Sequence, residues 1–166
     1  MRAEVSIHIE APPERVWRLV TDVARMGEWS PVTYRCEWID GASGASVGAR
    51  FMGYNRMPPV RWWTLCEVVA LEPFRLFEFR TIDGTFSLGS RGREMTRWRY
   101  RLEPEGGGTR LSESYEVRFV PALLRIPERV ARLVPAGRRV IDERRERTRQ
   151  GMRETLRRIK VAAEAG

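Results

Sequence analysis

Apolar and polar residues alternate along most of the chain, and this pattern predicts β-strands. In residues 3–10, Val5, Ile7 and Ile9 are separated by polar side chains, and a period of two is typical of a strand with one buried face. The same period predicts about six further strands, near residues 32–39, 51–55, 60–71, 74–81, 93–103 and 109–119. Turn-rich tracts such as 40–48 and 104–108 separate them, so we expect an antiparallel sheet.

Helical spacing replaces the alternation directly after the first strand. Pro13 stands at a place where the first turn of a helix tolerates proline, and Val16 and Val20 then fall on one face. Gly27 ends this pattern, and residues 28–31 predict a second, very short helix or a turn.

A different pattern follows the last predicted strand. Residues 121–135 are amphipathic and bounded by prolines, and we interpret them as a short helix that could form a lid. Residues 137–163 predict one long helix, whose inner face is small or polar at its middle, with Thr148, Gly151 and Thr155.

The order of these elements predicts an α+β fold in a single domain that spans residues 1–166. A meander of about six strands curves because strands twist, and a long helix can lie across the concave side. Large aromatic residues on the sheet would then face small or polar residues on the helix. We therefore expect an internal cavity between sheet and helix.

The charge of the chain is concentrated at its C-terminal end. The formal net charge is +8 over 166 residues, yet the segment from Arg125 to Lys160 holds 13 basic and five acidic residues and so carries all of it. Such a segment is compatible with a solvated helix face, with an anionic partner, or with an anion site at a pocket mouth. No aromatic residue follows Phe119, which argues against a platform for nucleic acid.

Four segments resemble a known family: residues 9–31, 48–56, 98–117 and 149–160. Together they are similar to the START-like, helix-grip superfamily called SRPBCC, in its polyketide cyclase/dehydrase and lipid-transport branch. The resemblance implies a helix-grip fold with two short N-terminal helices, a curved antiparallel sheet and a deep apolar cavity. It also implies binding of lipids, sterols, polyketides or other hydrophobic molecules, and some members are aromatase/cyclases.

The side chains on the expected inner phases are the candidate ligand-binding residues. They come from the sheet and from the long helix: Tyr34, Phe51, Asn55, Trp62, Phe77, Phe79, Trp98, Tyr100, Glu113, Tyr115, Arg144, Arg145, Thr148, Met152 and Thr155. Arg144 and Arg145 straddle the inner face of the helix, so either could bind an acidic head group or extend into solvent.

Glu113 is the one candidate for catalysis. Beside Tyr100 and Tyr115 its carboxyl would be desolvated, with a raised pKa, and could serve as a general acid or base. It could instead pair with Arg144 or Arg145. Glu94 is also expected to face inward, but several residues farther along the sheet.

Other kinds of site find little support. Cys36 and Cys66 fall on strands two apart, too far for a disulfide, and we interpret both as core residues. His8 lies on a polar phase and is expected at the surface. No zinc, dinucleotide or phosphate-loop motif is present, so we expect no metal and no cofactor. The N-terminus lacks a signal-peptide core, which favours the cytoplasm.

The sequence thus predicts a protein that binds or carries a hydrophobic small molecule, with or without an acidic head group. One alternative is a polyketide cyclase or aromatase that uses the same pocket. A second is a lipid-transfer module that contacts an anionic membrane through its basic segment, with Arg125, Arg129 and Arg132 of the lid as contacts. The sequence leaves open whether the protein is an enzyme, and whether it is a monomer or a homodimer.

Overall fold

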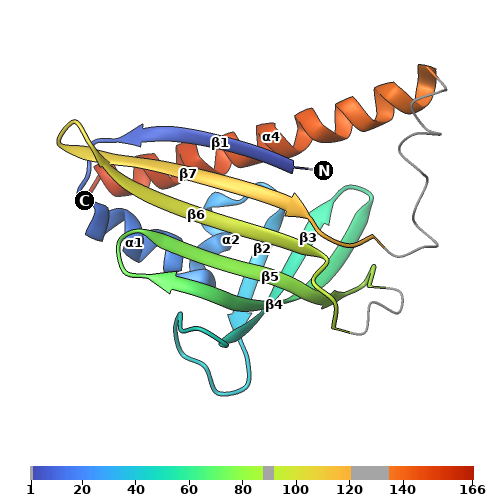
Figure 1. Ribbon diagram of the computed structural model, residues 1–166, viewed down its shortest axis with the longest axis horizontal. Helices are drawn as coiled ribbons and strands as arrows, with labels where there is room; N and C mark the ends of the chain where they lie inside the picture. Colours follow the sequence, from blue (N-terminus) through green and yellow to red (C-terminus); the bar gives the residue numbers. More distant parts are fainter. Residues whose placement is uncertain (1, 88–91, 121–134) are drawn as a thin grey trace.

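The computed structural model describes residues 2–87, 92–120 and 135–166, with the side chains of the last segment from Asp142 onward. It contains a seven-stranded antiparallel sheet in the order β1-β7-β6-β5-β4-β3-β2, shown in Figure 1. The strands are β1 (Arg2–Ile9), β2 (Thr33–Trp38), β3 (Arg50–Met57), β4 (Val60–Glu72), β5 (Leu76–Gly84), β6 (Thr96–Glu105) and β7 (Gly108–Val117). The α+β, helix-grip class expected from the sequence is confirmed.

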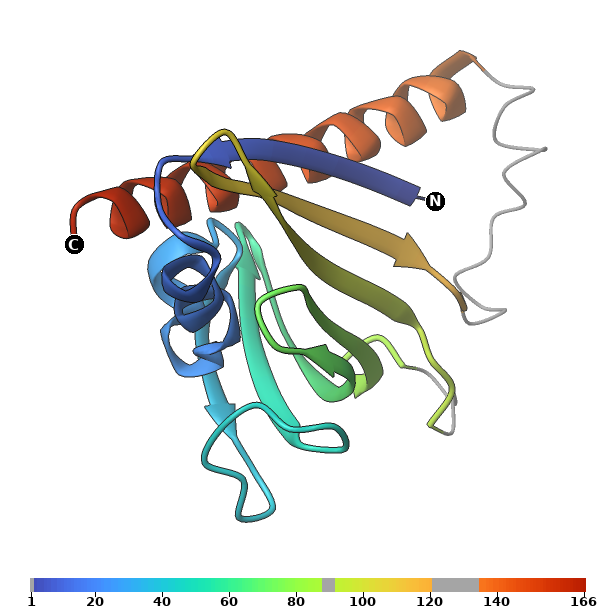
Figure 2. The same cartoon turned by 60° about the vertical axis from the view of Figure 1, so that its left-hand side comes forward.

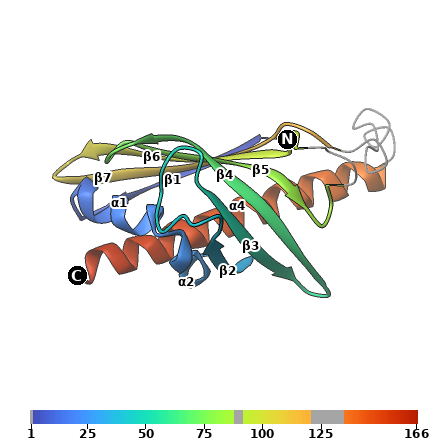
Figure 3. The ribbon, with the colours of Figure 1, turned by 90° about the horizontal axis from the view of Figure 1, so that it is seen from below.

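The helices lie on one side of this sheet. They are α1 (Pro13–Thr21), the short 3-10 helix η1 (Val23–Arg25), α2 (Met26–Trp29) and α4 (Pro135–Glu164). Figure 3 shows α1, α2 and α4 against the same face of the sheet, which curves around them as seen in Figure 2. The long helix begins at Pro135, two residues before the predicted start, because proline is tolerated in a first turn. The predicted lid at 121–135 lies, apart from Pro135, outside the described residues.

Among the described side chains of α4, those that pack into the core lie in the C-terminal half of the helix. Met152, Leu156, Ile159 and Ala163 are buried there at helical spacing, and this half of the helix contacts β1, α1 and α2. Residues 142–150 are mostly exposed, and the helix continues past the sheet in Figure 1. Among the described residues, no helix is both long and apolar enough to cross a membrane.

A two-residue turn between β6 and β7 sets the register of these two strands, which carry Tyr100 and Glu113. Gly106 and Gly107 have positive φ angles of 56° and 83°, a conformation that glycine adopts without a steric penalty. The turn places Tyr100 of β6 directly opposite Glu113 of β7. Counting outward from this turn, the sequence predicts that Glu113 lies opposite roughly residues 99–101, and the structure confirms this.

Candidate functional site

A buried carboxyl group lies on the concave face of the sheet. Glu113 is 3% exposed, and its Oε1 accepts a hydrogen bond of 3.0 Å from the hydroxyl of Tyr100. Its other oxygen, Oε2, is also buried and has no hydrogen-bond partner among the described residues. Buried polar atoms are nearly always hydrogen-bonded, so this oxygen distinguishes Glu113 from ordinary core residues.

The surroundings of Glu113 favour its neutral form. Burial raises the pKa of Glu113 to about 8, and the hydrogen bond from Tyr100 only partly opposes this effect. Burial and the adjacent carboxyl likewise raise the pKa of Tyr100 well above its usual value. At neutral pH Glu113 is therefore mostly a carboxylic acid, and a protonated Oε2 is a hydrogen-bond donor without an acceptor.

A chain of buried aromatic rings extends from Tyr100 along the concave face. The ring of Tyr100 stacks on Phe77 at 6.4 Å between centroids, and Phe77, Phe79 and Phe51 continue the contacts at 5.6 and 5.1 Å. These three phenylalanines are almost fully buried. These three phenylalanines form an apolar wall beside the Tyr100–Glu113 pair, and both members of the pair are themselves buried.

A second set of polar side chains crosses the concave face from β2 to β6, nearer the hairpin that joins β3 and β4. We call it the hydroxyl row; it consists of Thr33, Asn55, Thr64, Cys66, Thr81 and Thr96. Thr33 donates to Asn55 Oδ1 at 2.7 Å, and Thr96 donates to Thr81 at 2.8 Å. The thiol of Cys66 lies between the two ends, 3.8 Å from Thr64 and 3.7 Å from Thr81.

The thiol in this row is a neutral group. Burial raises the pKa of Cys66 to about 11, and it raises the pKa of Cys36 to about 12. Both cysteines are free and buried, on β4 and β2, which confirms their interpretation as core residues. Among the described residues no group of three or more histidine, cysteine or acidic side chains could hold a metal ion.

Comparison with known proteins agrees with this architecture. Residues 1–164 match the family model described as polyketide cyclase / dehydrase and lipid transport. The chain belongs to this family. No curated protein matches the sequence.

Solved structures extend the comparison. The polyketide cyclase-like protein Cgl2372 of Corynebacterium glutamicum is 37% identical, with 96% of this chain and 88% of that chain covered and a TM-score of 0.60. A START superfamily protein of Mycobacterium smegmatis shares 12% identity over 99% and 97% of the two chains, with a TM-score of 0.70. Ginseng major latex-like protein 151 of Panax ginseng, also 12% identical, covers 98% and 97% at a TM-score of 0.67. The last two show the fold alone.

Two side chains expected to face inward do not. Tyr34 is 43% exposed, because a β-bulge between Thr33 and Arg35 shifts the register of β2 and turns Tyr34 outward. Glu94 precedes β6 and is bound to Arg97, 2.6 Å away. Its expected inward position was wrong because the strand begins two residues later, at Thr96.

The expected ion pair of Glu113 with an arginine of the long helix is also wrong. Among the described residues, only Tyr100 donates a hydrogen bond to Glu113. Arg144 is exposed, but its charge acts on Tyr115, where it partly opposes the rise in pKa that burial causes. Arg145 is half-buried. The helix thus places a cation near Tyr115, whereas the pKa of Glu113 responds to burial and to Tyr100.

The other ligand-binding residues that the sequence predicts form three groups in the structure. Phe51, Phe77, Phe79 and Tyr100 are buried around Glu113; Trp98 and Tyr115, 4.4 Å apart, are half-buried. Asn55 belongs to the hydroxyl row, and half-buried Trp62 lies 6.2 Å from Phe86. On α4, Met152 and Thr155 are buried and Thr148 is half-buried.

Sequence reasoning missed the four threonines of the hydroxyl row. A signal was present, since threonine recurs on successive strands, but only the register shows that these residues are neighbours.

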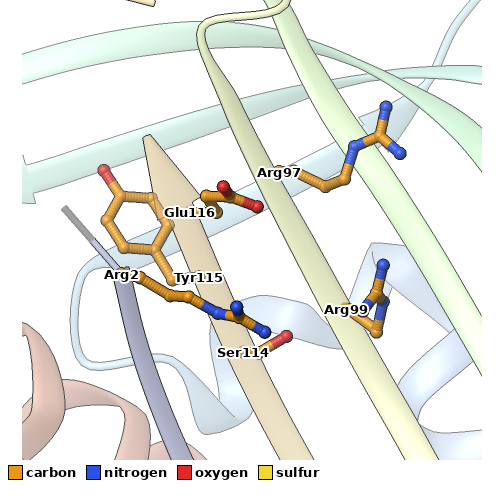
Figure 4. Close-up of a pocket in the computed structure, with 6 residues that line it drawn as sticks. All are labelled: Arg2, Arg97, Arg99, Ser114, Tyr115 and Glu116. Carbon is orange, nitrogen blue, oxygen red and sulfur yellow. The ribbon is translucent and has the colours of Figure 1, made fainter. Parts of the chain in front are cut away.

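A shallow pocket lies on the opposite, convex face of the sheet. Figure 4 shows its lining residues, Arg2, Arg97, Arg99, Ser114, Tyr115 and Glu116. With about 10 Å³ of space it has room for roughly one water molecule, and most of its side chains belong to the outward phase of β1, β6 and β7. Glu113 is not among its lining residues.

Proposed function

We propose that this protein binds an apolar small molecule on the concave face of its sheet, with Glu113 as the hydrogen-bonding group. The observation that carries the proposal is the buried, unpartnered Oε2 of Glu113 among the described residues. Leaving such a group without a partner costs about 1–3 kcal/mol. A ligand oxygen, as in a carbonyl or hydroxyl group, would recover this free energy by accepting a hydrogen bond from the neutral acid.

The rest of the concave face restricts the ligand further. The phenylalanine wall suits a hydrocarbon or ring system, and the hydroxyl row offers a second line of polar contacts toward the β3–β4 end. Arg144, near Tyr115, suits a carboxylate at the outer end of the molecule. A lipid or polyketide-like molecule with one inner oxygen and an acidic head meets all three conditions.

A second candidate function is acid–base catalysis in the same place. A group whose pKa of about 8 lies close to neutral pH can give up and regain a proton during a reaction. In its ionised form Glu113 could accept the proton from the α-carbon of an enolisable polyketide and then return it to the oxygen of the enolate. Catalysis needs an ionisable group at this position, so Glu113→Gln should abolish it, whereas ligand binding should tolerate the same substitution.

Native mass spectrometry of freshly purified protein, followed by organic extraction, is the experiment that tests the proposal. We expect a lipid-like molecule that carries at least one oxygen. Its affinity should fall about tenfold in Glu113→Leu but little in Glu113→Gln, which keeps a donor beside the Tyr100 contact. Glu116→Gln, on the outward phase of the same strand, is the matched control.

The two functions then separate clearly. If Glu113→Gln binds the extracted molecule normally but no longer converts it, the protein is an enzyme. If Glu113→Leu retains full affinity, Glu113 is not the polar contact and the proposal fails. Should nothing co-purify, the same variants can be compared for binding of the apolar fluorophore anilinonaphthalene sulfonate, where equal binding by all would also contradict it.

A further inference from the structure

The hairpin between β3 and β4 ends in an exposed apolar and basic tip. We define the β3–β4 tip as residues 56–63, with the sequence Arg-Met-Pro-Pro-Val-Arg-Trp-Trp. Met57, Val60 and Trp63 are 36%, 45% and 38% exposed, and both prolines are exposed as well. Figure 3 shows this hairpin projecting from the sheet on the side of α4.

The tip contains two arginines and no acidic residue of its own. No aspartate or glutamate occurs between Gly41 and Cys66. Arg56 and Arg61 are directly opposite one another across the hairpin, a placement that is unfavourable for like charges. Arg56 contacts the ring of Tyr34 at 5.6 Å. An anionic partner would remove the repulsion between the two arginines.

Neighbouring elements enlarge the same surface. Arg147 of α4 reaches the tip, where its Nη1 lies 3.6 Å from the sulfur of Met57. Phe86, 46% exposed, follows β5 and lies 6.2 Å from Trp62. Acidic residues of α4, among them Glu146, offset only part of the positive charge of that helix, so α4 adds to the positive charge of the hairpin.

We propose that the β3–β4 tip docks this protein onto an anionic lipid bilayer. The aliphatic apex would enter the interface, while Arg56 and Arg61 bind lipid phosphates and Trp63 lies at head-group level. The two prolines favour this role, because they lack the N–H groups that would otherwise need partners away from water.

The shape and chemistry of the tip favour a membrane over other anionic partners. The apex is convex and aliphatic, with Met57 and Val60 on either side of two prolines. These side chains offer no hydrogen bonds to a nucleic acid backbone, yet they gain free energy when hydrocarbon replaces water around them. The proposal does not depend on ligand binding at Glu113, and docking can be measured without a ligand.

Sedimentation of the full-length protein with vesicles tests the proposal. Vesicles of phosphatidylglycerol and phosphatidylcholine in equal parts should bind the protein, and added salt should weaken this binding. Vesicles of phosphatidylcholine alone should bind it poorly. Arg61→Glu should reduce binding about tenfold or more, since one arginine near a charged surface contributes roughly a fivefold change and the variant also adds repulsion.

This variant separates docking from folding. The carboxylate introduced by Arg61→Glu would face Arg56, so an attractive pair replaces a repulsive one and stability should stay equal or rise. Arg101→Glu is the matched control, because Arg101 is an exposed arginine on the outward phase of β6, and the net charge changes equally. The double substitution Met57→Ser and Val60→Ser should also weaken binding about tenfold through the lost apolar contact.

Several outcomes would overturn the proposal. It fails if Arg61→Glu and Arg101→Glu lose binding equally, since net charge alone would then explain the effect. It also fails if vesicles with and without phosphatidylglycerol bind the protein equally well. The same holds if the double serine variant binds as well as the unmodified protein. Tighter binding to a DNA duplex than to the mixed vesicles would assign the tip to nucleic acid instead.

Discussion

Two glutamates with similar burial occupy opposite faces of the same sheet. On the convex face, Glu78 has a side chain that is 5% exposed and binds Arg97 at 2.7 Å and also Arg99. On the concave face, Glu113 is 3% exposed and accepts a hydrogen bond from the hydroxyl of Tyr100. The first carboxyl is paired with two cations, and the second is paired with a neutral phenol.

The comparison shows that burial by itself does not decide the chemistry of a carboxyl group. The charge of a buried carboxylate needs a partner of opposite charge, and the arginines of β6 lie within ion-pair distance of Glu78. The concave face supplies aromatic rings instead, so Glu113 keeps its proton. A charged pair stabilises the outer surface, whereas a neutral acid can face an apolar ligand at lower cost.

The largest expected effect is on how the stability of the protein depends on pH. The pKa of Glu113 is about 8 in the folded chain against an ordinary value of 4.5. Below 4.5 both states are protonated; between 4.5 and 8 only the unfolded chain loses the proton, which favours unfolding. This carboxyl should therefore lower the free energy of unfolding by about 5 kcal/mol across that window. Glu113→Gln should abolish this loss.

Urea denaturation of the unmodified protein and of Glu113→Gln at several pH values measures the effect. The difference in free energy of unfolding between Glu113→Gln and the unmodified protein should grow in favour of glutamine up to about pH 8 and then level off. Glu116→Gln, on the outward phase of the same strand, is measured beside it as the matched control. A constant difference across the window would mean that Glu113 titrates normally.

The second expected effect concerns the other glutamate. Glu78→Gln removes the charge that binds Arg97 and Arg99, whose side chains are 27% and 34% exposed. Because the arginines keep some contact with water, we expect a loss of about 2 kcal/mol, below the usual cost of breaking a fully buried pair. Urea denaturation at pH 7 gives the value.

A more exposed pair on the same face provides the control. Glu67 binds Arg80 at 2.9 Å with side chains 25% and 34% exposed, and Glu67→Gln should cost less than about 1 kcal/mol. Equal losses in free energy of unfolding for Glu78→Gln and Glu67→Gln would show that burial does not strengthen the ion pairs of Glu78. The contrast between Glu78 and Glu113 would then not follow from their burial.

The fold and the central pair followed from local sequence signals. Period-two alternation located the strands. The glycine turn between β6 and β7 placed Glu113 opposite roughly residues 99–101, which include its observed partner Tyr100. Helical spacing on α4 identified Met152 and Thr155 as inward residues. These features depend on near neighbours along the chain, which the sequence displays directly.

What the sequence could not predict depends on irregularities and on distant neighbours. The bulge after Thr33 turned Tyr34 outward, and nothing in the alternation signals it. The supposed partners of Glu113 on α4 depended on how the helix crosses the sheet, which is set by packing at its C-terminal half. The hydroxyl row likewise needs the register of five strands.

The third expected effect sharpens the comparison at Glu113 itself. Tyr100→Phe removes the hydrogen bond to Oε1 and should cost about 1–2 kcal/mol. Because that bond lowers the pKa of Glu113, its loss should raise the pKa further. The pH at which the difference from Glu113→Gln levels off should therefore move upward, as the same urea measurements would show.

Combining the two substitutions separates packing from titration. In the Glu113→Gln background no carboxyl remains, so Tyr100→Phe should still reduce stability but should no longer affect its pH dependence. If the pH dependence shifts even there, the tyrosine acts on some other group. If Tyr100→Phe leaves the levelling pH of the unmodified protein unchanged, burial alone sets the pKa of Glu113, and Tyr100 serves only to fill the apolar wall.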